Sequence, residues 1–395
     1  MISRYRKLPD SRGFRIRLSC CGSSPARDAD TPRSMPVAVR TRVDWGTKID
    51  KLLIVRPLHR GTPASNPGWP GNAGMLHANL IIIHRGGQYA RDFAEIGGKI
   101  VARDPGIAVF CIDQHTRRVM GDEAWQRPSL TVALLARFEA EIRRGPVLMN
   151  RAIHKTGQHR IFTKAGIPTP PTLRFVPGMK LDPIMFGELV VIKPTNPRIA
   201  SYGRGIQLFR RRKLETMRLR DFPRDHLIHQ DRDGFIVQRL IDTGPLLKMH
   251  RVQTLFGVPL YCWAAQNHEP IPPIGGTDEE IERVAIASNA GQERVRRLCV
   301  DSEALALAAR VGEAFPHVPI LGMDIVRDEK TGKIYVLECN PGGNTWHFSS
   351  EAVVSIRQQF GGGDEAAGRQ KMIDQFGAFD LAAEVLVRKV RELAA

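Results

Sequence analysis

The sequence predicts a mixed α/β and α+β protein, with an N-terminal α/β domain followed by two α+β segments. Short apolar runs at residues 79–85 and 106–113 alternate with helical patterns, which is typical of a parallel sheet. After Gly145 and Pro146 the pattern changes to strand-like runs separated by loops. The 395 residues, 42% of them hydrophobic, are enough for two or three hydrophobic cores.

The N-terminal domain is expected over residues 49–147. A first strand is expected at 51–56, and the two apolar runs supply two more strands. A helix is expected over 129–144, because four apolar residues recur there at helical spacing: Val132, Leu135, Phe138 and Ile142.

A small α+β module is expected over residues 148–243. Its helix, at 156–165, is expected to end at Gly166 before Pro168. Three strand-like runs follow, at 188–193, 205–209 and 235–238.

The C-terminal domain is expected over residues 244–395. Its strands are expected at 247–257 and 259–266, with helices near 278–298 and 302–314. A hairpin is expected over 321–340, and an amphipathic helix from 379 closes the chain.

The chain is strongly basic, with 58 Lys and Arg against 41 Asp and Glu and a net charge of +17. Residues 1–48 hold nine Arg and two Lys against four Asp, so they carry +7 of this charge. They contain no apolar segment of the kind a secretory signal needs. We expect a disordered basic tail there, or a translation start at Met35, in preference to a transit peptide.

The six cysteines form no C-x-x-C pair and no spacing typical of zinc. They are interpreted as reduced thiols of a cytoplasmic protein. The longest apolar runs are too short to span a bilayer, which excludes an integral membrane protein.

The hairpin at 322–341 carries the clearest chemical signal. If the loop is Lys330-Thr331-Gly332, Asp324 lies opposite Glu338, and Asn340 returns to the same face two residues later. Two close carboxylates and an amide suit Mg²⁺ or Mn²⁺. The alternative is an exposed hairpin whose acids never meet, because a slip of one residue separates them.

Two lysines stand where they could bind phosphate. Lys193 ends an apolar strand before a loop containing Gly203 and Gly205, and Lys155 opens a helix. No Walker A motif is present. Each signal alone has an ordinary explanation, namely a hairpin turn for the glycines and a solvated helix residue for Lys155.

Taken in order, these segments resemble the ATP-grasp superfamily. The matching segments are Lys155 with 165–170, Val190–Pro194, the loop through Gly205, 236–241, and Asp324 with 338–341. The chain is most similar to carboxylate-amine ligases such as D-alanine ligases, glutathione synthetase and glutamate-tailing ligases. The resemblance covers roughly residues 148–345 and, weakly, the preceding α/β unit.

The resemblance implies a pre-ATP-grasp-like N-terminal domain and a two-part ATP-grasp fold that clamps ATP. Lys155 and Lys193 would contact the phosphates under a mobile loop containing Gly203 and Gly205. Backbone groups of Arg239, Leu240 and Ile241, with Gln238 beside them, would bind adenine. Asp324, Glu338 and Asn340 would bind Mg²⁺ or Mn²⁺, and Arg251 would face the reacting phosphoryl group; otherwise it is surface charge on a strand.

Two features depart from the family pattern. Gln238-Arg239 stands where Glu with an apolar or Lys neighbour is common, and Asp242 is the best candidate for the ribose hydroxyls. The segment 342–347 is expected near the acceptor pocket, although Trp346 fits core packing equally well.

The resulting hypothesis is an ATP-dependent ligase that joins a small carboxylate to an amine or a thiol through an acyl phosphate, releasing ADP and phosphate. Kinase-like transfer to a hydroxyl is the first alternative. A non-catalytic nucleotide- or nucleic-acid-binding protein is the second, based on the basic clusters at 210–213 and 294–297. Stacking aromatics are nearly absent from those clusters, and Glu215, Asp221 and Asp225 interrupt the first. A solvated helix face is therefore favoured over nucleic-acid contacts.

Overall fold

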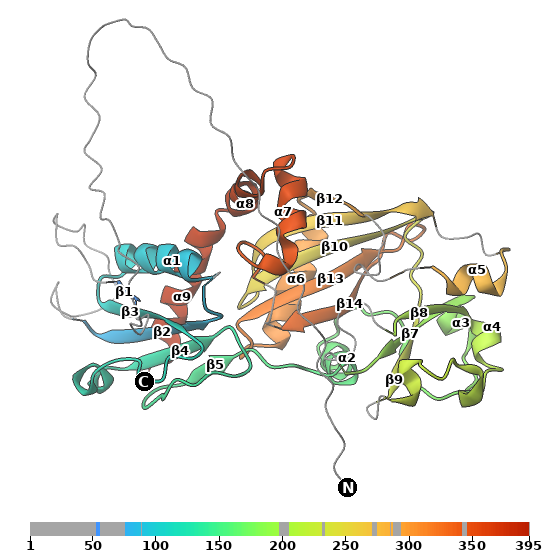
Figure 1. Ribbon diagram of the computed structural model, residues 1–395, viewed down its shortest axis with the longest axis horizontal. Helices are drawn as coiled ribbons and strands as arrows, with labels where there is room; N and C mark the ends of the chain where they lie inside the picture. Colours follow the sequence, from blue (N-terminus) through green and yellow to red (C-terminus); the bar gives the residue numbers. More distant parts are fainter. Residues whose placement is uncertain are drawn as a thin grey trace, which may run out of the picture. The chain divides into compact units, whose positions relative to one another are not determined.

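The computed structural model describes residues 53–55, 76–87, 89–196, 205–230, 234–270, 275–284, 286, 294–341 and 346–394. The basic tail expected at 1–48 lies outside these residues. Within the described part, three sheets alternate with helices (Figure 1), so the predicted fold class of mixed α/β and α+β is confirmed.

The N-terminal sheet has the strand order β1-β3-β2-β4-β5. The pairs β3–β2, β2–β4 and β4–β5 are parallel, and the edge strand β1 is antiparallel to β3. The bounds are β1 (Leu53–Val55), β2 (Ala78–His84), α1 (Ala90–Arg103), β3 (Ile107–Asp113), β4 (Ser129–Ala133) and β5 (Val147–Met149).

The helix predicted over 129–144 is wrong. Residues 129–133 form β4, which is buried on both faces between β2 and β5, and no helix follows before β5. Of the four apolar residues at helical spacing only Val132 lies in β4, which also contains Ser129 and Thr131, so the spacing did not report a helix. Phe138 and Ile142 contact the core from an irregular segment instead.

The central module is an antiparallel sheet of order β6-β9-β7-β8 with short helices. The bounds are α2 (Lys155–Lys164), β6 (Thr172–Phe175), α3 (Pro183–Phe186), β7 (Leu189–Pro194), β8 (Gln207–Arg210), α4 (Arg211–Leu214) and β9 (Phe235–Arg239). The predicted helix end at Gly166 is confirmed, since this residue has a φ of 63° that interrupts the helix.

The C-terminal sheet is antiparallel, with the order β12-β11-β10-β13-β14. The bounds are β10 (Leu246–Leu255), β11 (Val258–Pro270), α5 (Asp278–Glu282), β12 (Arg294–Leu298), α6 (Ser302–Ala314), β13 (Ile320–Arg327), β14 (Ile334–Pro341), α7 (Val354–Gly361), α8 (Glu365–Asp374) and α9 (Ala378–Leu393).

The helical region predicted near 278–298 is wrong at its end, because Arg294–Leu298 is an edge strand. The interpretation of the basic clusters as solvated helix faces is wrong for 294–297, which lies in a strand, and holds only in part for 210–213, where α4 forms and Arg212 is exposed. Arg211 is buried and pairs with Glu215, Lys213 pairs with Glu282, and Arg294 is buried within β12.

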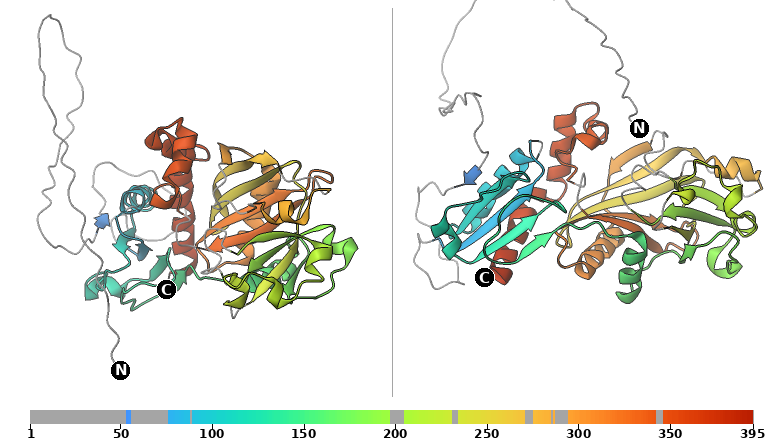
Figure 2. Two further views of the ribbon diagram at one scale, coloured as in Figure 1. Left: turned by 45° about the vertical axis from the view of Figure 1, so that its right-hand side comes forward. Right: turned by 60° about the horizontal axis from the view of Figure 1, so that its bottom comes forward.

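The terminal helix α9 packs against elements of both the N-terminal and the C-terminal sheet regions. Its apolar face contacts α1, β4 and β11 (Figure 2), and its buried residues share one core with the N-terminal and C-terminal sheets. Among the described residues, no helix is both long enough and apolar enough to cross a membrane.

Helix α6 covers the C-terminal sheet through a close backbone contact at Gly312. A Cβ atom on Gly312 would lie 2.2 Å from the Cα of Gly257, in the turn between β10 and β11. Only glycine permits this approach.

We expect Gly312→Ala to destabilise the protein by about 2–4 kcal/mol, because the backbone at Gly257 cannot yield as a side chain can. Gly98→Ala is the matched control. Gly98 also lies inside a helix, but its added Cβ would meet nothing within 4 Å, so this change should stabilise by about 0.5–1 kcal/mol. Denaturant unfolding of both variants measures the difference, and equal effects would contradict the contact.

Candidate functional site

The hairpin β13–β14 brings the two predicted metal-binding carboxylates together. Asp324 lies directly opposite Glu338, and Asn340 lies opposite Gly322 on the same face. The predicted pairing of these acids is confirmed.

The predicted turn of this hairpin is wrong in detail. Near the turn the register is shifted by one residue, with Arg327 opposite Ile334 and the Asp328 amide donating to the Lys333 carbonyl at 2.8 Å. A bulge at Leu337 restores the register before Glu338. The one-residue shift at the turn and the extra residue at the bulge cancel, so Asp324 and Glu338 still lie opposite each other.

Lys155 and Glu338 form the contact that joins α2 to the hairpin. The Lys155 ammonium donates a hydrogen bond to Glu338 Oε2, and the lysine is 8% exposed. Gln158, one turn later on α2, accepts a hydrogen bond from the Cys339 amide at 3.0 Å. This second contact fixes the helix beside the hairpin.

Lys193 reaches the same region from β7. Its Nζ donates to Gln238 Oε1 at 2.7 Å, and Gln238 Nε2 donates to Thr172 Oγ1 at 3.0 Å. Gln238 therefore orients Lys193 through a buried network. The sequence placed Gln238 beside adenine and did not identify this role.

Arg251 lies on β10, opposite Asp324. Arg251 Nε is 2.7 Å from Asp324 Oδ1, and Nη2 donates to Oδ2 at 3.1 Å. Asn340 Nδ2 donates to the same Oδ2 at 3.4 Å. Three cations and two carboxylates from five elements thus meet on one face of the sheet.

The electrostatics follow from burial and from this close charge pairing. Burial lowers the pKa of Lys193 to about 8, against the opposing effect of Glu338. Burial raises the pKa of Glu338, but Lys155 and Lys193 outweigh it and hold the value at about 2. Burial also raises the pKa of Asp324, against the effect of Arg251. Near neutral pH Glu338 is therefore an anion that can bind a metal.

The donor set fits one hard divalent cation that keeps open coordination positions. Within the described part of the chain, no group of three or more His, Cys, Asp or Glu could hold a metal ion. Two carboxylates and an amide suit Mg²⁺ or Mn²⁺, which usually takes its remaining ligands from water and phosphate oxygens. Lys155 and Arg251 neutralise the same carboxylates here.

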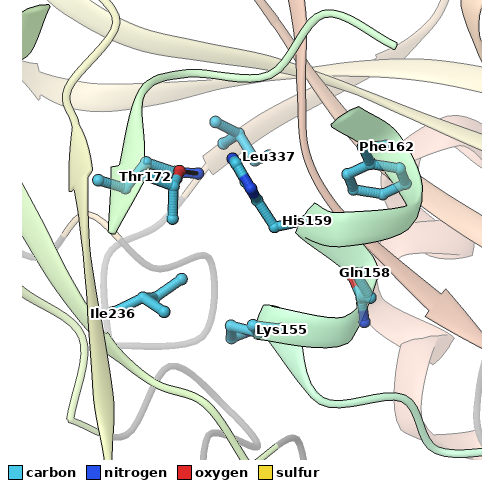
Figure 3. A pocket seen from close by; sticks show the side chains of 8 residues that line it. Lys155, Gln158, His159, Phe162, Thr172, Ile236 and Leu337 are labelled. Carbon is cyan, nitrogen blue, oxygen red and sulfur yellow. Dashed lines mark hydrogen bonds between the residues drawn. The ribbon is translucent and has the colours of Figure 1, made fainter. Parts of the chain in front are cut away.

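A small pocket adjoins Lys155 (Figure 3). Its walls come from α2, β6, β9 and the bulge of β14, and its lining residues are Lys155, Gln158, His159, Phe162, Thr172, Ile236, Gln238 and Leu337. Sequence reasoning identified only Lys155 and Gln238 of these residues as site residues. Thr172 and Leu337 could not be placed, because β6 and the bulge were not predicted. The alternation in Thr172–Phe175 was the available signal.

The predicted adenine-binding segment is largely occupied by contacts within the protein. The amides of Arg239 and Leu240 donate to the carbonyls of Pro171 and Leu189 at 2.9 and 3.1 Å. Ile241 is buried.

Asp242 is tied to the hairpin turn. Its carboxylate lies 3.3 Å from Lys330 Nζ, and its carbonyl accepts from the Glu329 amide at 2.7 Å. Its assignment to the ribose hydroxyls therefore has no support from its contacts.

The glycine loop is only partly described. Gly203 lies outside the described residues. Gly205 has a φ of 70°, and a Cβ there would lie 2.9 Å from both Leu227 and Pro194, which explains why glycine occupies the position.

Trp346 is a core residue, one of the two interpretations left open by the sequence. It is 1% exposed and donates to Asp92 at 2.8 Å. The next residue, His347, stacks on Tyr261 with ring centroids 5.7 Å apart. Burial and the nearby Arg251 and Arg357 lower the pKa of His347 well below its usual value, so the imidazole is neutral.

Comparisons with known proteins gave matches among solved structures only. No protein-family model matches the chain, and no curated protein matches it. D-cycloserine synthetase DcsG is 17% identical, with 78% of this chain and 99% of that chain covered and a TM-score of 0.39.

Two other similar structures are ligases. D-alanine–D-alanine ligase from Bacillus anthracis is 12% identical, with 80% and 99% of the chains covered and a TM-score of 0.38. The ATP-grasp ligase PsnB, complexed with precursor peptide PsnA2 and AMPPNP, is 12% identical, with 79% and 98% covered and a TM-score of 0.41. All three TM-scores are below 0.5, so the likeness by itself carries no argument about what this chain does.

Proposed function

We propose that this protein is an ATP-grasp enzyme, an ATP- and Mg²⁺-dependent ligase that joins a carboxylate to an amine or a thiol. The observation that carries the proposal is the ion pair between Lys155 and Glu338. It places a lysine suited to bind phosphate against a carboxylate suited to bind the metal of a nucleotide. Lys193 and Arg251 supply further positive charge beside the same carboxylates.

The residues then have the following roles. Asp324, Glu338 and Asn340 hold Mg²⁺ (or Mn²⁺), which when bound neutralises charge on the phosphate oxygens of ATP. Lys155 and Lys193 bind those phosphates, and Gln238 orients Lys193. Positioning and charge stabilisation supply most of the catalysis in phosphoryl transfer, so no protein nucleophile is required.

In the proposed reaction, a carboxylate oxygen of the substrate attacks the γ-phosphorus of ATP. The bond from this phosphorus to the β,γ-bridging oxygen breaks, giving an acyl phosphate and ADP. The amine or thiol then attacks the acyl carbon, and phosphate leaves. Arg251, which contacts Asp324, stabilises charge on the phosphoryl group during transfer.

Hydroxylamine trapping tests the reaction class. With ATP, Mg²⁺ and a panel of carboxylic acids, we expect hydroxylamine to convert the acyl phosphate to a hydroxamate as ADP is released. Wild-type protein without ATP is the control. ADP release with alcohols and no hydroxamate with any acid would contradict the ligase proposal and would indicate the kinase-like alternative.

A further inference from the structure

The carboxylate site continues into a row of polar side chains on the same face of the C-terminal sheet. Residues directly opposite in antiparallel strands point to the same face. Asp324 lies opposite Arg251, and Arg251 lies opposite Trp263. Two residues further along β11, Ala265 lies opposite Arg296, so Arg296 shares this face.

The polar atoms along this face are buried without partners. Gln253 and Tyr261 are 0% exposed, and Trp263 is 3% exposed. Both amide atoms of Gln253, Tyr261 Oη and Trp263 Nε1 have no hydrogen-bond partner among the described residues. Buried polar groups are rarely left unpaired, because a missing hydrogen bond costs free energy. Of these residues, Trp263 lies opposite Arg251, so a ligand beside Arg251 would supply a partner for Trp263 Nε1.

Two arginines end the row on the edge strand β12. Arg294 is 5% exposed and donates to the Ile286 carbonyl at 3.1 Å, while Arg296 donates to the Arg294 carbonyl at 3.2 Å. The Nε atom of each is buried and has no hydrogen-bond partner among the residues that the structure describes. Within the described part of the chain, neither arginine has a carboxylate within 4.0 Å, unlike Arg210, Arg251 and Arg327.

The absence of an acidic partner is costly for these arginines. Burial lowers the pKa of Arg294 to about 10, with a further lowering by Arg296 and an opposing effect of the more distant Asp324. Burial also lowers the pKa of Arg296. Two adjacent cations that repel each other in a partly buried site are expected to bind an anionic group strongly.

We propose that Arg294 and Arg296 bind a second anionic group of the substrate, which is therefore an extended small molecule with negative charge at both ends. This inference rests on the proposed function, because the other anionic group of the substrate is the carboxylate that the proposed ligase activates beside Arg251. The second group is a carboxylate or a phosphate. Trp263, which lies opposite Arg251 on β11, offers its Nε1 to the part of the substrate beside Arg251. Gln253 and Tyr261 lie on the other side of Arg251 from Arg296 and do not face this part.

The strand geometry sets the length of this substrate. Arg251 and Arg296 are two strands apart and two residues apart along the strands. Strand spacing and rise per residue place their Cα atoms about 12 Å apart. The two anionic ends must therefore be separated by several carbon atoms, and the shortest diacids should not reach both sites.

A series of straight-chain diacids from succinate to suberate measures this directly. Each acid is titrated calorimetrically into the full-length protein with Mg²⁺ and a nonhydrolysable ATP analogue, beside monoacids of equal length such as hexanoate and octanoate. We expect a longer diacid to bind at least about 10-fold more tightly than its monoacid, the worth of a charge-assisted pair. Phosphonocarboxylates of the same lengths distinguish a phosphate from a carboxylate at the second position.

Three variants assign the effect to the arginines. Arg296→Ala should remove the preference for diacids and leave monoacid binding unchanged. Arg294→Lys retains a charge and should weaken the preference only in part, which guards against loss of folding. Arg297→Ala is the matched control, because Arg297 is exposed and opposite Ala264 on the other face. It should bind as wild type does.

Equal binding of diacids and monoacids, no binding of either series, or an unchanged preference in Arg296→Ala would overturn this inference. Its failure is distinguishable from failure of the ligase proposal. Hydroxamate formed with monoacids alone would retain the ligase and reject the second anion site. A preference for diacids without any hydroxamate would retain the anion site and reject the ligase.

Discussion

Glu338→Gln is expected to lower substrate-driven ADP release at least about 100-fold, equivalent to roughly 2.7 kcal/mol of activation free energy. The amide keeps the shape of the side chain and can still accept a hydrogen bond from Lys155. It no longer supplies the negative charge that, together with Asp324, binds the divalent cation. A coupled assay for ADP measures the loss, with circular dichroism and thermal unfolding as checks on the fold.

Glu329→Gln is the matched control for this prediction. Glu329 lies in the same hairpin, but its side chain is 55% exposed and contacts Lys248 at 3.5 Å, away from the carboxylate pair. Its removal should leave ADP release within about twofold, because exposed ion pairs contribute little. Unchanged turnover in Glu338→Gln, with normal folding, would reject Glu338 as a metal ligand.

Lys193→Met is expected to weaken binding of Mg²⁺ and the ATP analogue about 10- to 100-fold, the worth of a charged hydrogen bond. It should change the stability of the unliganded protein by less than about 2 kcal/mol. Removal of a buried charge offsets the loss of the bond to Gln238. Lys164→Met, at the exposed end of α2, is the control and should bind nucleotide normally.

The same lysine predicts a pH dependence of stability. Burial lowers its pKa to about 8 in the folded protein, from 10.5 in the unfolded chain. Between these values the unfolded chain binds more protons, so the free energy of unfolding contributed by this group rises with pH. Wild type should therefore gain stability relative to Lys193→Met from about pH 8 to pH 10.5. A difference that stays constant, or that falls over this range, would show that Lys193 titrates normally.

The sequence predicted the pairing of Asp324 with Glu338 because the hairpin is local. The separation of Asp324 from Glu338 along the chain determines whether they face each other, and the only long-range requirement is that the strands pair. The prediction was correct although the turn was not, since the bulge at Leu337 shifts the register by one residue. No sequence rule used here locates a bulge.

The errors in the predicted secondary structure arose where the spacing of apolar residues along the chain did not report the strand. Residues 129–133, Ser-Leu-Thr-Val-Ala, form a short strand, and of the four apolar residues at helical spacing only Val132 lies in it, so this spacing arose by chance. In β12 two of the three inward side chains, Arg294 and Arg296, are arginines and only Leu298 is apolar, so the usual alternation of apolar and polar residues is absent. That same departure is what identifies Arg294 and Arg296 as candidates for binding an anion.

The side-chain networks that join distant segments could not be predicted from the sequence. The bonds from Lys193 to Gln238 and from Gln238 to Thr172 require the pairing of β6 with β9 and of β9 with β7. Likewise, the contact of Lys155 with Glu338 depends on where α2 lies against the hairpin. Residue types suggested these groups, but only packing brings them together.

The central claim is that Lys155, Lys193 and the carboxylate pair form one site for metal-bound ATP. Calorimetric titration of a nonhydrolysable ATP analogue, with Mg²⁺ and with EDTA, tests it most directly. We predict micromolar or tighter binding with Mg²⁺, at least about 10-fold weaker binding with EDTA, and loss of this metal dependence in Glu338→Gln. Equal affinity with and without the metal, or no binding by the wild-type protein, would contradict the account.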